Sequence, residues 1–245
     1  MHTPFREGIL AEEATWQAVV LIPKGGKDYQ GIGLMEVMWK VVAAVLNRRI
    51  TASITSHDFD HGFWSGRGTG TATLEAKLLQ QLADLRKEVL YVILLDLHKA
   101  YDALDRSRCL DILEGYGMGP RVRRLLQIYW MRLTRVAREG GYYGTIFKGA
   151  RGVTQGDPLS PTIFNMVVDA VVKHWVTVVI AGVEERGERG KEGRHQASQF
   201  YSYDGIVASY DPLWIQGAFN TLVSLFDRVG LRTNVGKIVG MVCRP

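Results

Sequence analysis

A single carboxylate ends a run of apolar residues in the first half of the chain. Residues 89–95 are apolar, with β-branched and aromatic members, and Asp96 follows them directly. This pattern predicts a buried strand. A carboxylate at the exit of such a strand is held by the sheet and faces a cleft, which suits a metal ligand. The alternative, favoured when this stretch is considered alone, is that Asp96 only caps the following turn.

A second carboxylate lies in a region that reads as a hairpin. Two short β-rich runs within residues 199–210 surround residues 202–205, and Asp204 lies at the tip. A third polar segment, residues 149–161, brackets Gln155 with glycines and ends in Pro-Leu-Ser-Pro. Its prolines suit the first turn of a helix. The start of that helix offers free N–H groups and a positive dipole end, which favour a phosphate or a paired template base.

Two glycine-rich segments have the composition of phosphate-binding loops. Residues 24–33 follow a short apolar strand at 19–23, and their backbone N–H groups, with Lys24 and Lys27, would cradle a triphosphate. A hairpin turn with solvated lysines is the alternative, and it is favoured for this segment alone. Residues 57–72 place Arg67 between two glycines, where it either reaches a phosphate or is an exposed turn residue.

Helical spacing of apolar residues predicts the elements that position these groups. The expected helices cover residues 34–54, 73–87, 107–116, 120–131, 162–179 and 212–229. Runs at 133–137 and 142–147 flank Gly140-Gly141 and predict a hairpin, and 237–243 predicts a last strand. Six arginines fall within one short span: Arg121, Arg123, Arg124, Arg132, Arg135 and Arg138. They would form either a basic face that contacts nucleic acid or a solvated face, and the sequence supports the two equally.

Composition narrows the class of protein. The chain has 245 residues, 47% hydrophobic and 22% charged, enough for a substantial core. A formal net charge of +5 is weakly in favour of a polyanionic partner. Its two cysteines, Cys109 and Cys243, show no zinc or disulfide spacing. The N-terminus lacks a secretion signal, and charged residues interrupt the longest apolar stretch, 170–183, so we expect an intracellular protein, cytoplasmic or nuclear, with no membrane span.

Together these segments resemble the fingers and palm of reverse transcriptases of the group II intron and non-LTR retrotransposon type. The resemblance runs from about residue 21 to 243. Several motifs agree in order and type: Leu-Ile-Pro-Lys at 21–24, Asp-x-x-Lys-Ala-Tyr-Asp at 96–102, Gln-Gly-Asp-Pro-Leu-Ser-Pro at 155–161 with Phe-Asn at 164–165, Phe-Tyr at 200–201, and Gly-Leu-x-x-Asn-x-x-Lys at 230–237. Each motif alone is weak, whereas the ordered set is specific.

The resemblance implies DNA synthesis on an RNA template, from dNTPs, by two-metal phosphoryl transfer. Two Mg²⁺ ions about 3.5–4 Å apart would be held by oxygen ligands, with Asp96 and Asp204 as the catalytic and metal-binding pair. The same resemblance gives the nucleotide-binding residues. Tyr101 would lie under the incoming sugar, Gln155 and Gly156 would line the nucleotide and template pocket, Lys237 would lie near the pyrophosphate, and the triphosphate contacts would be Lys24, Lys27 and Arg67.

The resemblance also implies an α/β (α+β) right-hand polymerase fold, with an antiparallel palm sheet covered by helices on one face, plus fingers and no thumb. Residues 1–90 with the 133–150 hairpin would form the fingers, and 91–132 with 151–245 the palm. The strands that carry Asp96 and Asp204 would be neighbours in the palm sheet. RNA template and RNA–DNA duplex would be the partners, with no membrane, and a thumb or endonuclease domain would be missing.

The chain departs from the family pattern at the catalytic hairpin. The family reads Tyr-x-Asp-Asp, whereas residues 201–204 read Tyr-Ser-Tyr-Asp, so Tyr203 replaces a metal-binding aspartate. A tyrosine with a pKa of about 10 is no oxyanion near neutral pH. Gln30 stands in place of an arginine and Trp64 in place of a basic residue. We therefore expect weak or absent polymerase activity. The alternatives are a maturase-like RNA-binding module without catalysis, or a decayed retroelement copy.

Overall fold

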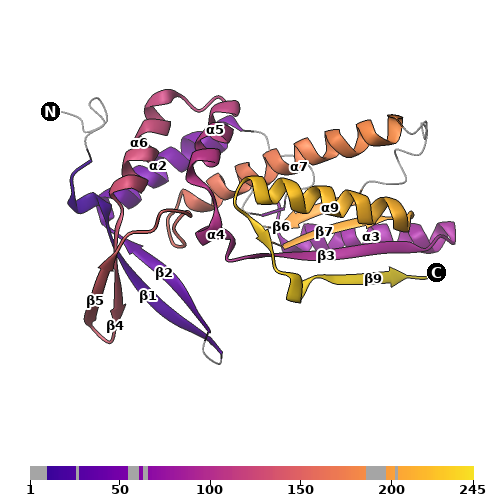
Figure 1. The fold of residues 1–245 in the computed structure, drawn as a ribbon, viewed down its shortest axis with the longest axis horizontal. Helices are drawn as coiled ribbons and strands as arrows, with labels where there is room; N and C mark the ends of the chain where they lie inside the picture. Colours follow the sequence, from indigo (N-terminus) through magenta and orange to yellow (C-terminus); the bar gives the residue numbers. More distant parts are fainter. Residues whose placement is uncertain (1–9, 26–27, 55–60, 63–65, 186–196, 202–203) are drawn as a thin grey trace. The chain divides into compact units, whose positions relative to one another are not determined.

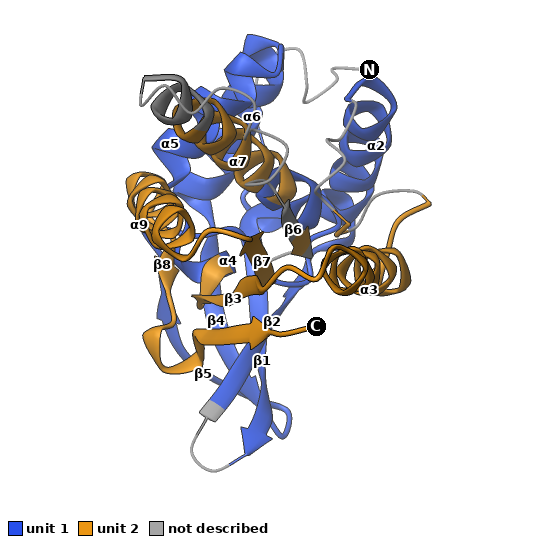
Figure 2. Ribbon diagram, turned by 90° about the vertical axis from the view of Figure 1, so that its right-hand side faces the viewer, with its two compact units in different colours: residues 1–55, 101–164 blue, residues 56–100, 165–245 orange. Residues whose placement is uncertain are grey.

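The structure is a computed structural model that describes residues 10–25, 28–54, 61–62, 66–185, 197–201 and 204–245. The chain divides into two compact units, each made of two segments that are separated in the sequence (Figure 2). Residues 1–55 and 101–164 form the first unit, and residues 56–100 and 165–245 form the second. Each unit therefore contains residues expected at the active site.

The first unit is built on a four-stranded sheet with the order β2-β1-β4-β5. A short helix, η1 (Glu13–Thr15), precedes the hairpin of β1 (Trp16–Gly25) and β2 (Asp28–Met35). The second hairpin is β4 (Thr134–Glu139) and β5 (Tyr142–Phe147). Strands β1 and β4 pair in parallel, and the other pairs are antiparallel. The parallel pair joins two hairpins that are more than a hundred residues apart.

Strand β2 corrects one expectation from the sequence. The glycine- and lysine-rich segment 24–33 reads as a turn, but most of it belongs to β2. The reason is close packing, because an added Cβ at Gly33 would lie 2.3 Å from Gln17 Nε2 and 2.6 Å from Thr154 Cγ2. The glycine therefore allows a strand to approach its neighbours and does not mark a flexible loop.

The helices among the described residues of the first unit are α2 (Val37–Ser53), the short α4 (Ala100–Ala103), α5 (Arg106–Gly115) and α6 (Pro120–Arg132). α5 and α6 begin within one residue of the predicted positions. α2 begins three residues later than predicted, because Leu34 and Met35 belong to β2, and α4 was not predicted. Asp105 caps α5 by accepting hydrogen bonds from the backbone N–H groups of Ser107 and Arg108. The rings of Trp39 in α2 and Tyr129 in α6 stack with centroids 3.5 Å apart. Both side chains are fully buried, so this stack joins the two helices in the core.

The second unit contains a five-stranded sheet in which all the pairs are antiparallel (Figure 1). Its central strand is β3 (Leu90–His98), which pairs with β7 (Asp204–Ser209) along one side. β6 (Ala197–Tyr201) extends the sheet beyond β7. β8 (Arg232–Thr233) and β9 (Val239–Cys243) pair with the other side of β3, and η2 (Val235–Lys237) connects them. The expected antiparallel sheet is confirmed.

Three helices among the described residues complete the second unit: α3 (Thr69–Arg86), α7 (Ser160–Glu185), which begins in the first unit, and α9 (Pro212–Arg228). α9 packs on β7, β3 and β8, and α3 packs on β6. Trp175 of α7 donates a hydrogen bond from Nε1 to the Ala218 carbonyl of α9, at 2.7 Å. Gly230, with φ +82°, follows the last residues of α9 and ends that helix as predicted.

Helix α7 has the length and composition of a membrane span. Over Ser160–Val179 its mean hydropathy is 1.3, and 67% of this stretch is buried inside the protein. Burial to this extent is what the core helix of a folded domain shows. The charged Lys173 of this helix is paired within the protein. Its Nζ lies 2.6 Å from the buried carboxylate of Asp169, one turn earlier.

Candidate active site

Asp96 and Asp204 lie directly opposite each other on neighbouring strands. They are partners in the register of β3 and β7, at the end of the β7 ladder. This placement confirms the expectation that two carboxylates distant in the sequence meet on adjacent strands. Asp96 is not merely a turn cap, because it lies within β3, before the strand ends at His98.

The Asp96 carboxylate is held by residues that follow α9. Asn234 donates from Nδ2 to Asp96 Oδ2 at 3.0 Å, and its backbone N–H donates to the Asp96 carbonyl at 2.7 Å. Lys237 Nζ lies 3.3 Å from Oδ2 and 3.4 Å from Oδ1. The side chain of Asp96 is 15% exposed, whereas that of Lys237 is 65% exposed. A nearly buried carboxylate is therefore fixed by an amide and by an ammonium group that solvent can reach.

Asp204 is electrostatically coupled to Asp96. Partial burial, the negative charge of Asp96 and a hydrogen bond between the two side chains raise the pKa of Asp204, while Lys237 opposes the rise. The residue as a whole is exposed, so solvent screens the repulsion. Two carboxylates that repel each other provide a place where a cation gains energy by binding.

The pair opens into a cavity of about 450 Å³ in the second unit. Its walls include Ala72 of α3, Phe200 of β6, and Lys237 beside Asp96 and Asp204. Among the described residues, no three His, Cys, Asp or Glu side chains are grouped closely enough to hold a metal. Mg²⁺ commonly uses one or two protein carboxylates together with substrate phosphates, so the oxygen donors of the pair fit that ion.

The first unit holds the segment that carries Gln155 and Gly156. The Gly33 N–H of β2 donates to the Gln155 carbonyl at 2.8 Å, and the Val153 N–H donates to the Tyr101 carbonyl at 2.7 Å. Gly156 has φ +108°, and an added Cβ there would lie 2.6 Å from the Gly33 carbonyl oxygen. Backbone contacts therefore bring three of the expected nucleotide-binding residues, Tyr101, Gln155 and Gly156, into one region.

The side chains of the expected nucleotide-binding residues differ in exposure. Tyr101 is 9% exposed, and its ring stacks on that of Phe164 with centroids 4.9 Å apart. Lys24 is exposed in β1, and Arg67 is half-buried in the loop before α3. Lys237 was expected near a pyrophosphate, and it contacts Asp96. The predictions for Lys27, Trp64 and Tyr203 concern residues outside the described part of the chain.

Two positioning residues were missed from the sequence. Asn234 belongs to the Gly-Leu-x-x-Asn-x-x-Lys motif. Its bonds to Asp96 join segments that are 138 residues apart, so no local sequence pattern indicates them. Asp157, in the Gln-Gly-Asp-Pro motif, accepts from Trp39 Nε1 at 2.8 Å and from the Leu159 N–H at 2.9 Å. Burial raises the pKa of Asp157, and these hydrogen bonds counteract the rise. The motif aspartate thus ties the loop to α2.

Four of the six clustered arginines contact other groups of the protein. Arg123 pairs with Glu114 at 2.6 Å, and Arg132 donates to the Leu10 carbonyl at 3.1 Å. Arg135 donates to Gln17 Oε1 at 3.1 Å, and Arg138 lies over the ring of Tyr143 at 5.6 Å. Arg121 and Arg124 are exposed and make no such contact in the described part of the chain. Because Arg132 and Arg138 are exposed as well, a basic face for nucleic acid and a solvated face both stay predictions.

The sequence over residues 22–243 matches the family model described as reverse transcriptase (RNA-dependent DNA polymerase). The chain belongs to the reverse transcriptase family. It is 28% identical over 224 residues to the polyprotein of the type-2 retrotransposable element R2DM of Drosophila melanogaster, covering 91% of this chain and 20% of that protein. It is 30% identical over 143 residues to the R2 polyprotein of Nasonia vitripennis, covering 54% of this chain and 14% of that protein. This reverse transcriptase domain is therefore of the non-LTR retrotransposon type.

Solved structures show that the reverse transcriptase has the polymerase fold. The apo telomerase of Candida tropicalis matches with a TM-score of 0.69 at 13% identity, over 94% of this chain and 44% of that one. A form of that telomerase truncated from its C-terminal domain matches with a TM-score of 0.67 at 15% identity, over 96% of this chain and 51% of that one. At these identities the likeness concerns the fold alone. The chain spans about a fifth of the R2DM polyprotein.

Proposed function

We propose that this domain binds an RNA template and an RNA–DNA duplex, and extends the primer 3′-hydroxyl with dNTPs, with an activity that Tyr203 makes very weak. The register pairing of Asp96 with Asp204, in a chain of the reverse transcriptase family, carries the proposal. The proposed setting is intracellular.

The carboxylate pair would hold the metal. Mg²⁺ bound there would supply a Lewis acid that lowers the pKa of the primer hydroxyl and neutralises charge on the departing pyrophosphate. Asn234 keeps the Asp96 carboxylate in one orientation through its amide. Lys237 lies 3.3 Å from the Asp96 carboxylate, and its exposed ammonium would turn toward a phosphate of the substrate.

Several of the candidate nucleotide-binding residues belong to the first unit. Gln155 and Gly156 lie against β2, and because Gly156 has no Cβ, no side-chain atom comes between it and Gly33. Tyr101 would lie under the sugar of the incoming nucleotide. Lys24, Lys27 and Arg67 would contact the triphosphate, and Gln30 would be a lost contact. In this proposal residues 1–90 with 133–150 act as fingers and the rest as palm.

The proposed loss of activity follows from the smaller negative charge of the metal site. The site has two acidic residues where the family hairpin supplies a third, because position 203 is a neutral tyrosine. One fewer anionic ligand weakens the binding of a hard divalent cation and the neutralisation of transition-state charge.

A non-catalytic RNA-binding module, maturase-like as in group II intron proteins, is the second candidate. The observation in its favour is the same substitution, since binding an RNA backbone does not need the third carboxylate. A telomerase of Candida tropicalis, which is a structural neighbour, has been solved with a fragment of telomeric RNA. That likeness supports a fold able to hold RNA.

Primer extension on an RNA template, with Mg²⁺ or Mn²⁺, tests the proposal. The unaltered chain and Tyr203→Asp are compared, with filter binding on the same preparations. We expect background extension by the unaltered chain and at least about a hundredfold more by Tyr203→Asp. Robust synthesis by the unaltered chain would refute the impairment. Tight, strongly salt-dependent binding without extension by either chain would favour the binding module.

A further inference from the structure

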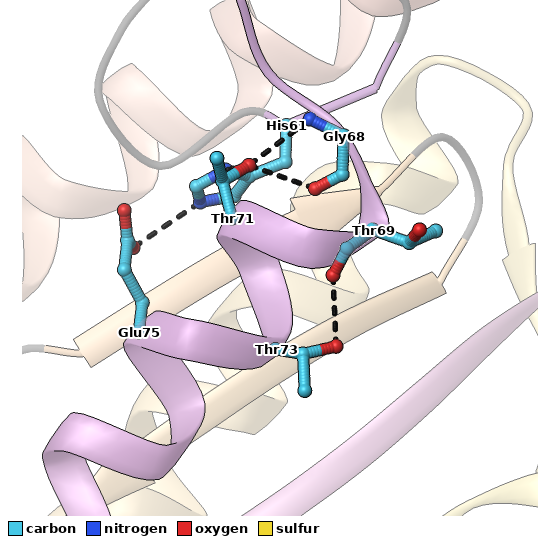
Figure 3. Close-up of polar contacts among 6 residues, drawn as sticks. All are labelled: His61, Gly68, Thr69, Thr71, Thr73 and Glu75. Atoms are coloured by element: carbon cyan, nitrogen blue, oxygen red, sulfur yellow. Dashed lines mark hydrogen bonds and ion pairs between the residues drawn. The ribbon is translucent and has the colours of Figure 1, made fainter.

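We propose that His61 is a positioning residue for the carboxylate pair, an inference that rests on the proposed function of that pair. His61 is 2% exposed, and it uses its backbone and both ring nitrogens within the second unit (Figure 3). It lies outside the residues that the family resemblance marks, and its contacts reach two elements, α3 and β6, that line the cavity with Asp96 and Asp204.

The backbone of His61 and Gly62 fixes β6. The His61 N–H donates to the Phe200 carbonyl at 2.8 Å. On the other side, the buried Asn165 of α7 donates from Nδ2 to the Gly62 carbonyl. The dipeptide is therefore held between a core helix and the outer strand of the sheet.

Strand β6 transmits this position to Asp204. Phe200 pairs with Gly205 in the register of β6 and β7, and the following residue, Tyr201, pairs with Asp204. The fully buried ring of Phe200 covers Gly205 so closely that an added Cβ there would lie 2.5 Å from Phe200 Cε1. A shift of the Phe200 backbone would therefore move the strand that carries the Asp204 carboxylate.

The ring of His61 fixes the start of α3. Nδ1 lies 2.9 Å from Thr71 Oγ1, and Nε2 lies 3.2 Å from Glu75 Oε2, as Figure 3 shows. A carboxylate only accepts hydrogen bonds, so the Nε2 position facing Glu75 carries the proton. Thr71 Oγ1 also accepts from the Gly68 N–H at 3.0 Å and lies 2.8 Å from the Gly68 carbonyl.

The first turn of α3 forms another wall of the same cavity. Ala72, next to Thr71, lines the cavity together with Phe200, Asp96 and Asp204. One buried side chain and its own backbone thus join α3 to β6, the two elements whose residues flank the carboxylates. If His61 only filled the core, loss of its two ring contacts would leave the structure of this cavity unchanged. Hydrogen exchange measures that difference.

Amide hydrogen exchange and Mn²⁺ binding on the whole chain test the proposal. Thr71→Val removes the hydroxyl at nearly constant volume. Thr73→Val is the matched control, because Thr73 lies in the same helix and donates to the Thr69 carbonyl at 2.8 Å without touching His61 (Figure 3). We expect Thr71→Val to speed exchange of the β6 and β7 amides about tenfold, with α9 unchanged, and to weaken Mn²⁺ binding severalfold. Thr73→Val should change neither.

Two variants at position 61 separate the ring contacts. In His61→Asn the amide takes the place of Nδ1 and keeps the Thr71 contact, whereas in His61→Gln it takes the place of Nε2 and keeps the Glu75 contact. Each should show a smaller increase in exchange than His61→Phe, which loses both. If His61→Phe does not fold, Thr71→Val and Glu75→Ala remove the same contacts from the other side.

The outcomes are distinct from those of the proposed function. Unchanged exchange and unchanged Mn²⁺ affinity in Thr71→Val and Glu75→Ala would overturn the role of His61, even if Tyr203→Asp extends primers. Faster exchange throughout the second unit, α9 included, would also overturn it, because it indicates general destabilisation. Local exchange and Mn²⁺ effects without any primer extension would support the role of His61 and count against the polymerase activity.

Discussion

The candidate residues of each unit are fixed by different means. In the first unit, the loop before α7 is fixed mainly by its backbone, through carbonyl and N–H groups and glycines with positive φ at Gly152 and Gly156, with the Asp157 carboxylate as a further contact. In the second unit, Asp96 is fixed by side chains, the amide of Asn234 and the ammonium of Lys237. A site built from side chains changes its chemistry by one substitution without loss of the fold. This difference is consistent with the proposal that Tyr203 lowers activity while the chain keeps the family fold.

The largest expected effect is chemical and lies in the second unit. In a Tyr203→Asp background, Asp96→Asn should lower primer extension on the order of a thousandfold, because the nearly isosteric amide cannot hold a divalent cation. The urea midpoint should move little, since Asn234 and Lys237 remain in place. Extension that survives Asp96→Asn would show that this residue is no metal ligand. The side chains around Asp96 in the second unit would then not be what determines the chemistry.

The next largest effect is structural and lies in the first unit. Gly152→Ala places a Cβ 2.6 Å from the Tyr101 carbonyl oxygen and 2.7 Å from Asp102 Cα, at φ +82°. We expect a loss of more than about 3 kcal/mol in the free energy of unfolding. Gly117→Ala is the control, since Gly117 has φ +80° in open space and should lose only about 1 kcal/mol. Equal losses in urea titrations would mean that backbone packing does not hold this loop.

A smaller effect concerns the support of Asp96. Asn234→Ala removes the 3.0 Å hydrogen bond to the carboxylate and should cost about 1 kcal/mol in unfolding free energy. It should also weaken Mn²⁺ binding, because Asp96 gains freedom to rotate. Asn220→Ala on the exposed side of α9 is the comparison, and should leave Mn²⁺ binding intact. Equal Mn²⁺ affinity in both variants would exclude a positioning role for Asn234.

The smallest effect is on proton binding. The folded-state pKa of Asp204 is raised, so the folded chain binds more protons than the unfolded chain between the ordinary carboxyl pKa and the raised value. Stability from this group therefore falls as pH rises through that window. Because Lys237 lowers the pKa of Asp204, Lys237→Met should raise it further. Carbon-detected NMR titration of the Asp204 carboxyl measures both values. A lower pKa in Lys237→Met would contradict the coupling.

The sequence predicts much of the fold because its signals are local. Asp105 before α5, Pro120 at the start of α6 and Gly230 after α9 mark boundaries through caps and backbone preferences, and the structure has them there. The pairing of Asp96 with Asp204 followed from the family resemblance and is confirmed. Contacts between distant segments were not predictable. His61 with Glu75, Asn234 with Asp96, and the packing that makes Gly33 part of a strand depend on where the chain folds back.

Mn²⁺ binding to the intact chain, followed by electron paramagnetic resonance, tests most directly whether Asp96 and Asp204 form one metal site. Unaltered protein, Asp96→Asn and Asp204→Asn are titrated under identical conditions. We predict saturable binding by the unaltered chain and loss of that binding in both variants, with unchanged unfolding midpoints. Equal binding in all three proteins would contradict the central claim.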